Sequence, residues 1–150
     1  MADTRNDPYG QFNFIVEIDG VKVAGFSEVS GLTMDTNIIE YREGNEQQTT
    51  VRKLPGHMKY TNIVCKRGQT NDTSLWTWRK KVIDGKTQRA TGTITLLDES
   101  RQPALSWNFR EGWPSKLEGP ALNGKTSEVA IETLEIAHEG LELVLPGGGS

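Results

Sequence analysis

The chain contains 150 residues, of which 17 are basic and 20 acidic, and it carries a formal net charge of −3. This length suits one domain that buries its own core without a disulfide or a metal, and the evenly spread charges exclude a basic face for nucleic-acid phosphates. The single cysteine, Cys65, excludes an internal disulfide, and two histidines beside it give no zinc-ligand spacing. We expect one domain over residues 1–150, with flexible ends at about residues 1–8 and 146–150.

The N-terminal segment, "MADTRNDPYGQ", is polar and lacks the apolar stretch of a secretory signal. The chain also has no run of roughly 18 apolar residues that would cross a membrane. We expect a protein that is made soluble in the cytoplasm, does not insert into a membrane, and can later be released by cell lysis.

The first predicted strands cover residues 12–18 and 21–23. Every second residue of "FNFIVEI" is apolar, and the "DG" at 19 and 20 is typical of a tight turn in a β-hairpin. A second, more polar hairpin follows, with strands over residues 36–41 and 49–54 joined by the tip "REGNEQQ". Pro55 is expected to end this hairpin, because proline cannot donate to a strand ladder.

A further strand is predicted in "YTNIVCKRG", with Cys65 as a small buried residue. The segment "NDTSLWTWRKKVIDGK" then has the pattern of one helix, over about residues 73–84. Asp72 or Thr73 can cap its start, Leu75 and Trp78 recur at helical spacing, and Gly85 can occupy the left-handed stop. The apolar stripe is narrow, which places this helix on the outside of a sheet.

The remainder of the chain is predicted as strands and loops. "ATGTITLLDESRQPALSWNFREGW" indicates two strands around a "DESRQP" turn, and "PSKLEGPALNGKTS" indicates a loop. The run "EVAIETLEIAHEGLELVL" fits a helix with one glutamate face or a strand with a break. We favour a strand with a bulge near Gly140, and we expect the glutamates to be solvated.

The sequence contains no recognisable catalytic or cofactor motif. Its serines lack the spacing of a nucleophile elbow, neither His57 nor His138 has an identifiable acidic partner, and both "GKT" segments lack the upstream glycine of a phosphate-binding loop. We expect no catalytic residue, metal or cofactor. The tryptophans at 76, 78, 107 and 113 are expected to pack in the core, since they fall on different elements, although a stacking platform for a sugar is an alternative.

The chain resembles the tail tube proteins of contractile phages and the inner tube proteins of extracellular contractile injection systems. Four segments carry the resemblance in the same order along nearly the whole chain: "DPYGQFNFIVEIDGVKVAGFSEVSGL", "EYREGNEQQTTVRKLPG", "LWTWRKKVIDGK" and "VAIETLEIAHEGLEL". The resemblance implies a mainly β fold: an antiparallel β-barrel or sandwich with one flanking α-helix and an extended β-hairpin arm. It also implies hexameric rings that stack into a hollow tube, in which strands of neighbouring copies form one closed sheet.

The resemblance places the arm, residues 36–54, against the channel and the adjacent ring. Alternation then suggests that Ile39, Tyr41 and Val51 face protein, while Glu40, Arg42, Thr50 and Arg52 face the channel or the next ring. The candidates for the lumen or for ring stacking are the polar residues of the arm: Glu40, Arg42, Glu43, Asn45, Glu46, Thr50 and Arg52.

The helix is expected on the outer side of the tube, where Arg79, Lys80 and Lys81 are candidates for contact with a sheath or a neighbouring copy. The implied partners are further copies of the chain, a sheath protein, baseplate or initiator and tail-terminator proteins, and a DNA or protein cargo. We therefore predict a structural, non-enzymatic tube subunit of a phage tail or injection particle. The alternative is a monomeric β-sandwich module that binds carbohydrate.

Overall fold

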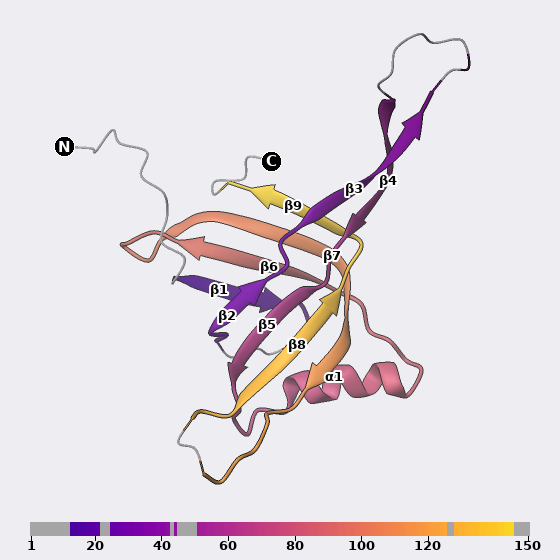
Figure 1. Cartoon of the computed structure of the whole chain (residues 1–150). Helices are drawn as coiled ribbons and strands as arrows, with labels where there is room; N and C mark the ends of the chain where they lie inside the picture. The colour runs from indigo at the N-terminus through magenta and orange to yellow at the C-terminus, as the bar shows by residue number, and fades with distance from the viewer. Residues whose placement is uncertain (1–12, 22–24, 43, 45–50, 126–127, 146–150) are drawn as a thin grey trace, which may run out of the picture.

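The computed structural model describes residues 13–21, 25–42, 44, 51–125 and 128–145. Antiparallel strands dominate this part of the chain, and the helix between them confirms the predicted fold class (Figure 1). The elements are β1 (Phe14–Ile18), β2 (Glu28–Ser30), β3 (Met34–Tyr41), β4 (Arg52–Tyr60), β5 (Ile63–Gly68), α1 (Ser74–Ile83), β6 (Ala90–Leu97), β7 (Pro103–Glu118), β8 (Ile131–Ala137) and β9 (Gly140–Val144).

The strand β7, which is 16 residues long, divides the main sheet into two halves. Its first part, residues 103–110, lies between β6 and β9, and β6 pairs with β1. We call these four strands half-sheet A. Its second part, residues 113–118, pairs with β8, which is followed by β5 and β2. These strands form half-sheet B.

The chain turns the corner between the half-sheets at two neighbouring places. Glu111 adopts a positive φ of 55° between the two parts of β7, and residues 138 and 139 separate β8 from β9. Phe109 fills the inside of the corner, and its ring lies so close to Gly92 and Gly112 that a Cβ on either glycine would be less than 2.5 Å from a ring carbon. Glycine at these positions therefore allows the sheet to fold around Phe109.

The core lies between the half-sheets and α1. Val16, Ile94 and Phe109 of half-sheet A pack with Cys65 and Leu134 of half-sheet B. Leu75 and Trp78 are the buried residues of α1, which confirms that this helix covers the outside of a sheet with one narrow apolar stripe. Gly85 has a φ of 75° just after the helix, as predicted for its left-handed stop.

The arm is a two-stranded ribbon of β3 and β4 that continues the paired strands β2 and β5 beyond half-sheet B. Figure 1 shows the ribbon extending away from both half-sheets. The prediction that Pro55 ends the hairpin is wrong, because β4 passes through Pro55 to Tyr60. A ribbon leaves one edge of each strand open, and the register shifts between Thr36 and Ile38, opposite Gly56; both features tolerate a proline.

One prediction lies partly outside the described residues, and another differs from the structure. The "DG" turn is present, with Gly20 at a φ of 75° and an antiparallel bridge between Ile18 and Val21, whereas the rest of the predicted second strand, residues 22 and 23, lies outside the described residues. On its other side β1 pairs with β6. The predicted loop from Pro114 onwards begins as strand, because β7 continues to Glu118 against β8.

The C-terminal run is strand, as favoured over helix. It is divided into β8 and β9 by a change of half-sheet rather than by a single bulge near Gly140. The sequence of this run does not distinguish a bulge from a change of half-sheet. The change of half-sheet is set by the bend of β7 around Phe109, which lies elsewhere in the chain.

The exit of the arm depends on Gly31, which has a φ of 89°. A Cβ at this position would lie 2.2 Å from the backbone oxygen of Asn62, which lies between β4 and β5. We predict that Gly31→Ala lowers the free energy of unfolding by about 2 kcal/mol or more, because both the backbone conformation and the close approach oppose a side chain. Thermal unfolding measures this loss. Gly119→Ala is the matched control, since its Cβ meets no atom within 4 Å, and equal melting temperatures for the two variants would contradict the prediction.

Candidate assembly surfaces

The arm exposes apolar side chains on both faces. The strand register places Met34, Ile38, Pro55 and Met58 on one side, which we call the methionine face. The other side, which we call the tyrosine face, carries Ile39, Tyr41 and Leu54. All the described residues of β3 are exposed, so neither face is covered by the chain's own half-sheets.

The register corrects part of the predicted arrangement of the arm. Arg52 is directly opposite Tyr41 and therefore shares the tyrosine face, whereas Glu40 is opposite Lys53 on the methionine face. Arg52 and Glu40 were expected on one face, and that expectation is wrong because the register shift at Gly56 changes the alternation of β4 relative to β3. Glu43, Asn45, Glu46 and Thr50 lie outside the described residues.

Half-sheet A has open edges on both sides within the described chain. On one side of this half-sheet, β1 pairs with β6, and its other edge carries only an isolated bridge between Ile18 and Val21 among the described residues. On the opposite side, β9 pairs with β7, and no described strand pairs with its other edge. Because the four strands alternate in direction, β1 and β9 run antiparallel to each other. Open edges of this kind favour pairing with another chain.

The outer face of half-sheet A consists mainly of small polar side chains. One cross-strand row contains Glu17, Thr93, Asn108 and Glu142, and the next contains Ile15, Thr95, Ser106 and Val144. The Thr93 hydroxyl donates to the Asn108 amide oxygen at 2.9 Å, and the Thr95 and Ser106 hydroxyl oxygens are 3.2 Å apart. The central side chains thus satisfy one another and form an even, polar surface.

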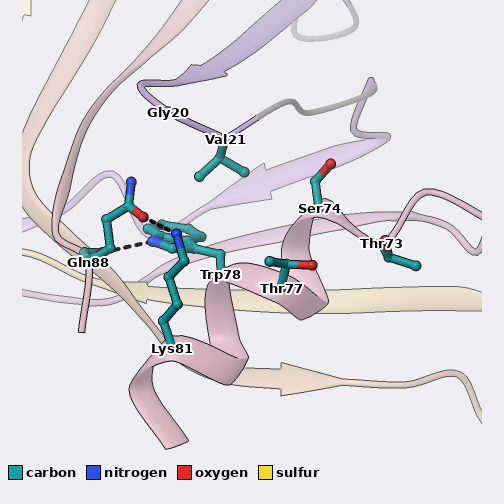
Figure 2. A pocket seen from close by; sticks show the side chains of 8 residues that line it. All are labelled: Gly20, Val21, Thr73, Ser74, Thr77, Trp78, Lys81 and Gln88. Carbon is teal, nitrogen blue, oxygen red and sulfur yellow. Dashed lines mark hydrogen bonds between the residues drawn. The ribbon is translucent and has the colours of Figure 1, made fainter. Parts of the chain in front are cut away.

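The basic residues of the predicted cluster on the helix have different partners. Lys80 lies 3.6 Å from Asp84, and the Lys81 ammonium donates to the Gln88 side chain. Figure 2 shows Gln88 beside Trp78, whose indole N–H donates to the Gln88 carbonyl at 2.8 Å. Trp78, Lys81 and Gln88 line a pocket of about 260 Å³ between the helix and the turn at Gly20. Lys80 and Lys81 remain exposed on the outside of the molecule, and Arg79 is half-buried.

A buried ion pair within half-sheet B, which the sequence analysis missed, joins Arg67 of β5 to Glu132 of β8. Arg67 is 1% exposed and Glu132 is 7% exposed; the Arg67 Nε donates to Glu132 Oε2 at 2.9 Å. The guanidinium also donates to Asp72 at 3.3 Å, just before the helix. The expectation that all the glutamates are solvated is therefore wrong for Glu132. The alternation of β5 could have predicted that Arg67 is buried, since Arg67 lies on the same inward face as Ile63 and Cys65.

Asp72 holds the start of the helix. Its carboxylate accepts hydrogen bonds from the Ser74 backbone N–H at 3.0 Å and from the Ser74 hydroxyl. These bonds, together with Arg67, lower the pKa of Asp72 below its usual range. The stabilisation they give is present above the unfolded-state pKa of Asp72 and is lost as the pH falls through the lower folded-state value.

The two histidines do not form a catalytic or metal-binding group within the described residues. His57 is exposed on the arm, and the two ring nitrogens of His138 lie 3.0 Å from the Thr61 oxygen and 3.1 Å from the Gly140 oxygen. The described residues contain no group of His, Cys, Asp and Glu that could hold a metal ion. Within the same part of the chain, no helix has the length and apolar character needed to cross a membrane.

The tryptophans do not support the alternative of a sugar-stacking platform. Trp78 is buried, as predicted, and Trp107 packs partly against the core. Trp76 is exposed, contrary to the expectation of core packing, while Trp113 is half-buried at the corner of β7. Of the four tryptophans, Trp76 alone is exposed.

Comparison with known proteins gives a consistent result. The sequence pattern of a family described as T4-like virus tail tube protein gp19 matches residues 10–142. No protein among the curated sequences matches the chain significantly.

Similar solved structures are found among injection systems. A chain of the sheath-tube complex of an extracellular contractile injection system, PVC, is 24% identical with a TM-score of 0.83 over 93% of each chain. A chain of the anti-feeding prophage baseplate is 22% identical with a TM-score of 0.84, covering 95% of this chain and 99% of that chain. Hcp1 from Flavobacterium johnsoniae is 15% identical with a TM-score of 0.54, covering 92% and 97%. These likenesses show a shared fold.

The buried pair generates a prediction about stability. Glu132→Gln leaves the Arg67 guanidinium buried without its nearest counter-charge, so we expect a loss of about 3 kcal/mol in the free energy of unfolding. Chemical denaturation measures the loss. Glu135→Gln, on the same strand, removes a partner of the exposed Lys116 and should cost about 0.5 kcal/mol. Similar losses of unfolding free energy for the two variants would contradict the prediction, because the buried pair would then contribute no more than the exposed one.

Proposed function

Because the chain belongs to the T4-like virus tail tube protein family, we propose that it is the subunit of a hollow tube built from stacked hexameric rings. The tube conducts DNA or a protein cargo. The proposal rests chiefly on half-sheet A, which combines two open edges with an even polar face. Within the described residues, a single copy leaves both edges open over most of their length, whereas a ring of copies pairs them.

Edge pairing between β9 of one copy and β1 of the next closes the ring. The two edge strands run in opposite directions within each copy. Rotation about an axis roughly along the strands preserves their directions, so the new pair between copies is antiparallel like every other pair of half-sheet A. Closure of a sheet on itself removes its edges and the hazard of uncontrolled aggregation.

The outer face of half-sheet A becomes the wall of the channel. Its hydroxyl and amide groups bond to one another across strands, as between Thr93 and Asn108, which reduces their need for partners on a passing cargo. Glu17 and Glu142 add negative charge, and Arg110 adds one positive charge near the corner. A wall of this kind presents little apolar surface, so cargo can slide without adhering.

The arm supplies contacts between rings. Glu40, Arg42 and Arg52 lie toward its distal end within the described residues, and the tip residues Glu43, Asn45, Glu46 and Thr50 are proposed for the same contact. The exposed apolar side chains on both faces support burial of the arm between copies rather than exposure of one whole face to the channel.

The helix α1 faces outward, where a contractile sheath would surround the tube. Arg79, Lys80 and Lys81 are proposed to meet acidic groups of that sheath, next to the exposed Trp76 and Ile83. A baseplate would start the tube and a terminator would end it. The complete particle is a phage tail or an injection particle, assembled in the cytoplasm and released by lysis.

Electron microscopy of the purified chain tests the proposal. We expect rings or tubes of uniform diameter, and persistent monomers at high concentration would overturn the proposal. The variant Asn108→Cys, labelled with a small gold cluster before assembly, should place gold density inside the tube. The matched variant Lys80→Cys should place it on the outer surface. Density on the outer surface for Asn108→Cys would show that half-sheet A does not line the channel.

Charge reversal tests the role of the helix. The triple variant Arg79→Glu, Lys80→Glu and Lys81→Glu should form tubes of normal diameter but lose sheath binding by at least tenfold, because each reversed charge replaces an attraction with a repulsion. Co-sedimentation of tubes with the sheath protein measures the binding. Reversal of the exposed Lys125, which lies in a turn outside the helix, is the control. Normal sheath binding by the triple variant would contradict the proposed contact.

A further inference from the structure

The outer face of half-sheet A is hollowed where β7 and β9 meet the base of the arm. A pocket of about 310 Å³ lies there, and residues of β6, β7, β9 and the end of β4 line it. Its polar lining consists of Tyr60, Thr91, Asn108, Arg110 and Glu142. We call this cavity the Arg110 pocket. Because Asn108 and Glu142 belong to one cross-strand row of the outer face, the pocket faces the channel of the proposed tube.

Arg110 is the cation of this pocket, and Gly140 leaves room for its side chain. The two residues lie directly opposite each other on β7 and β9. A Cβ at position 140 would lie 2.5 Å from Arg110 Nε and 3.1 Å from Arg110 Cζ. The arginine side chain therefore crosses space that only a glycine leaves open. Arg110 is exposed, and its guanidinium has no ion-pair partner within the described part of the chain, so its charge is available to a ligand.

Neutral hydrogen-bonding groups line the pocket beside the guanidinium. The Asn108 amide oxygen accepts the Thr93 hydroxyl at 2.9 Å, which leaves the amide NH₂ group of Asn108 to donate to a ligand. Tyr60 and Thr91 add hydroxyl groups to the lining. The Tyr60 ring packs against His138, with 5.5 Å between the ring centroids, and this contact holds the wall formed by the base of the arm. The pocket thus combines one planar cation with several hydrogen-bond donors.

We propose that the Arg110 pocket binds acidic side chains of a protein cargo in the channel. A guanidinium and a carboxylate match each other in two parallel hydrogen bonds, so arginine selects a carboxylate over a neutral acceptor. A carboxylate in the pocket would accept hydrogen bonds from Arg110 and from the amide group of Asn108. The volume of about 310 Å³ lies at the small end of the range for ligand pockets and suits a single side chain.

The charges beside the pocket favour a protein over DNA as its ligand. Glu142 lines the pocket, and Glu17 lies in the same cross-strand row of the outer face. These two carboxylates accompany one guanidinium, so a strand of phosphates would meet more repulsion than attraction. A protein can present a carboxylate to Arg110 and neutral or basic groups to Glu17 and Glu142. It can therefore satisfy both signs of charge on this surface.

Repetition along the tube gives weak pockets a combined effect. Each copy carries one Arg110 pocket, so stacked rings place these pockets at regular intervals along the channel. A cargo with several acidic side chains can occupy several pockets at once, and such multivalent binding is tighter than binding to one site. Each single contact is polar and open to water, so it can exchange while the cargo moves. The inference rests on the proposed tube function and adds the chemistry by which the channel would retain a protein cargo.

Binding of a short acidic peptide to assembled tubes tests the pocket. The probe is a fluorescent peptide of alternating glutamate and serine, and co-sedimentation with tubes measures its binding. Arg110→Gln should weaken binding roughly tenfold or more, because it removes a charge-assisted pair of hydrogen bonds. Arg101→Gln, in the turn between β6 and β7, removes the same charge elsewhere and should bind like the unmodified chain. Gly140→Ala keeps every charge but displaces the Arg110 side chain, so it should also weaken binding.

The outcomes separate this inference from the proposed function. If Arg110→Gln forms normal tubes by electron microscopy and binds the peptide as well as the unmodified chain does, the inference is overturned while the tube function stands. Equal binding of a peptide of alternating glutamine and serine would show that no carboxylate is recognised. Stronger binding of an oligothymidylate of the same length would show a site for phosphates, and either result also overturns the inference. If the unmodified chain forms no tubes, the proposed function fails and the inference fails with it.

Discussion

The bend in one long pair of strands controls the rest of this structure. β7 runs through both half-sheets, and β8 and β9 follow it on the same side around the corner. The corner forms because Phe109 fills it and glycine at positions 92 and 112 leaves room for the ring. Once the sheet is bent, the two inner faces can bury one core, and α1 can cover it through Leu75 and Trp78.

The same bend explains what the single copy leaves uncovered. In the described part of the chain, half-sheet A ends in two open edges, and half-sheet B continues into an arm that exposes apolar side chains on both faces. Exposed edges and apolar patches of this kind are a hazard for a monomer. In the tube that we propose, these features serve assembly: backbone pairing closes the ring, and the apolar side chains of the arm are buried between copies. In that proposal the polar outer face of half-sheet A needs only to let cargo pass.

The sequence predicted local features well wherever the signal is local. Alternation placed the strands around Val16 and Cys65, and the spacing of Leu75 and Trp78 placed the helix. It did not give the long-range pairing of strands, since β1 pairs with β6, some 75 residues later. Pro55 suggested an end, but an open-edged ribbon accommodates it. Glu132 looked like one glutamate among many, yet Arg67, from a distant strand, makes it part of the core.

The amino-acid sequence by itself determined that the chain is rich in strands, that it has an outer helix and a long arm, and that it belongs with tail tube proteins. These properties follow from the residue types and their spacing along the chain. Only the tertiary structure decided which strands pair, which edges stay open and which arm residues share a face. The physical reason is that a shift of one residue in register reverses both faces of a strand, and register is fixed by partners far away in the chain.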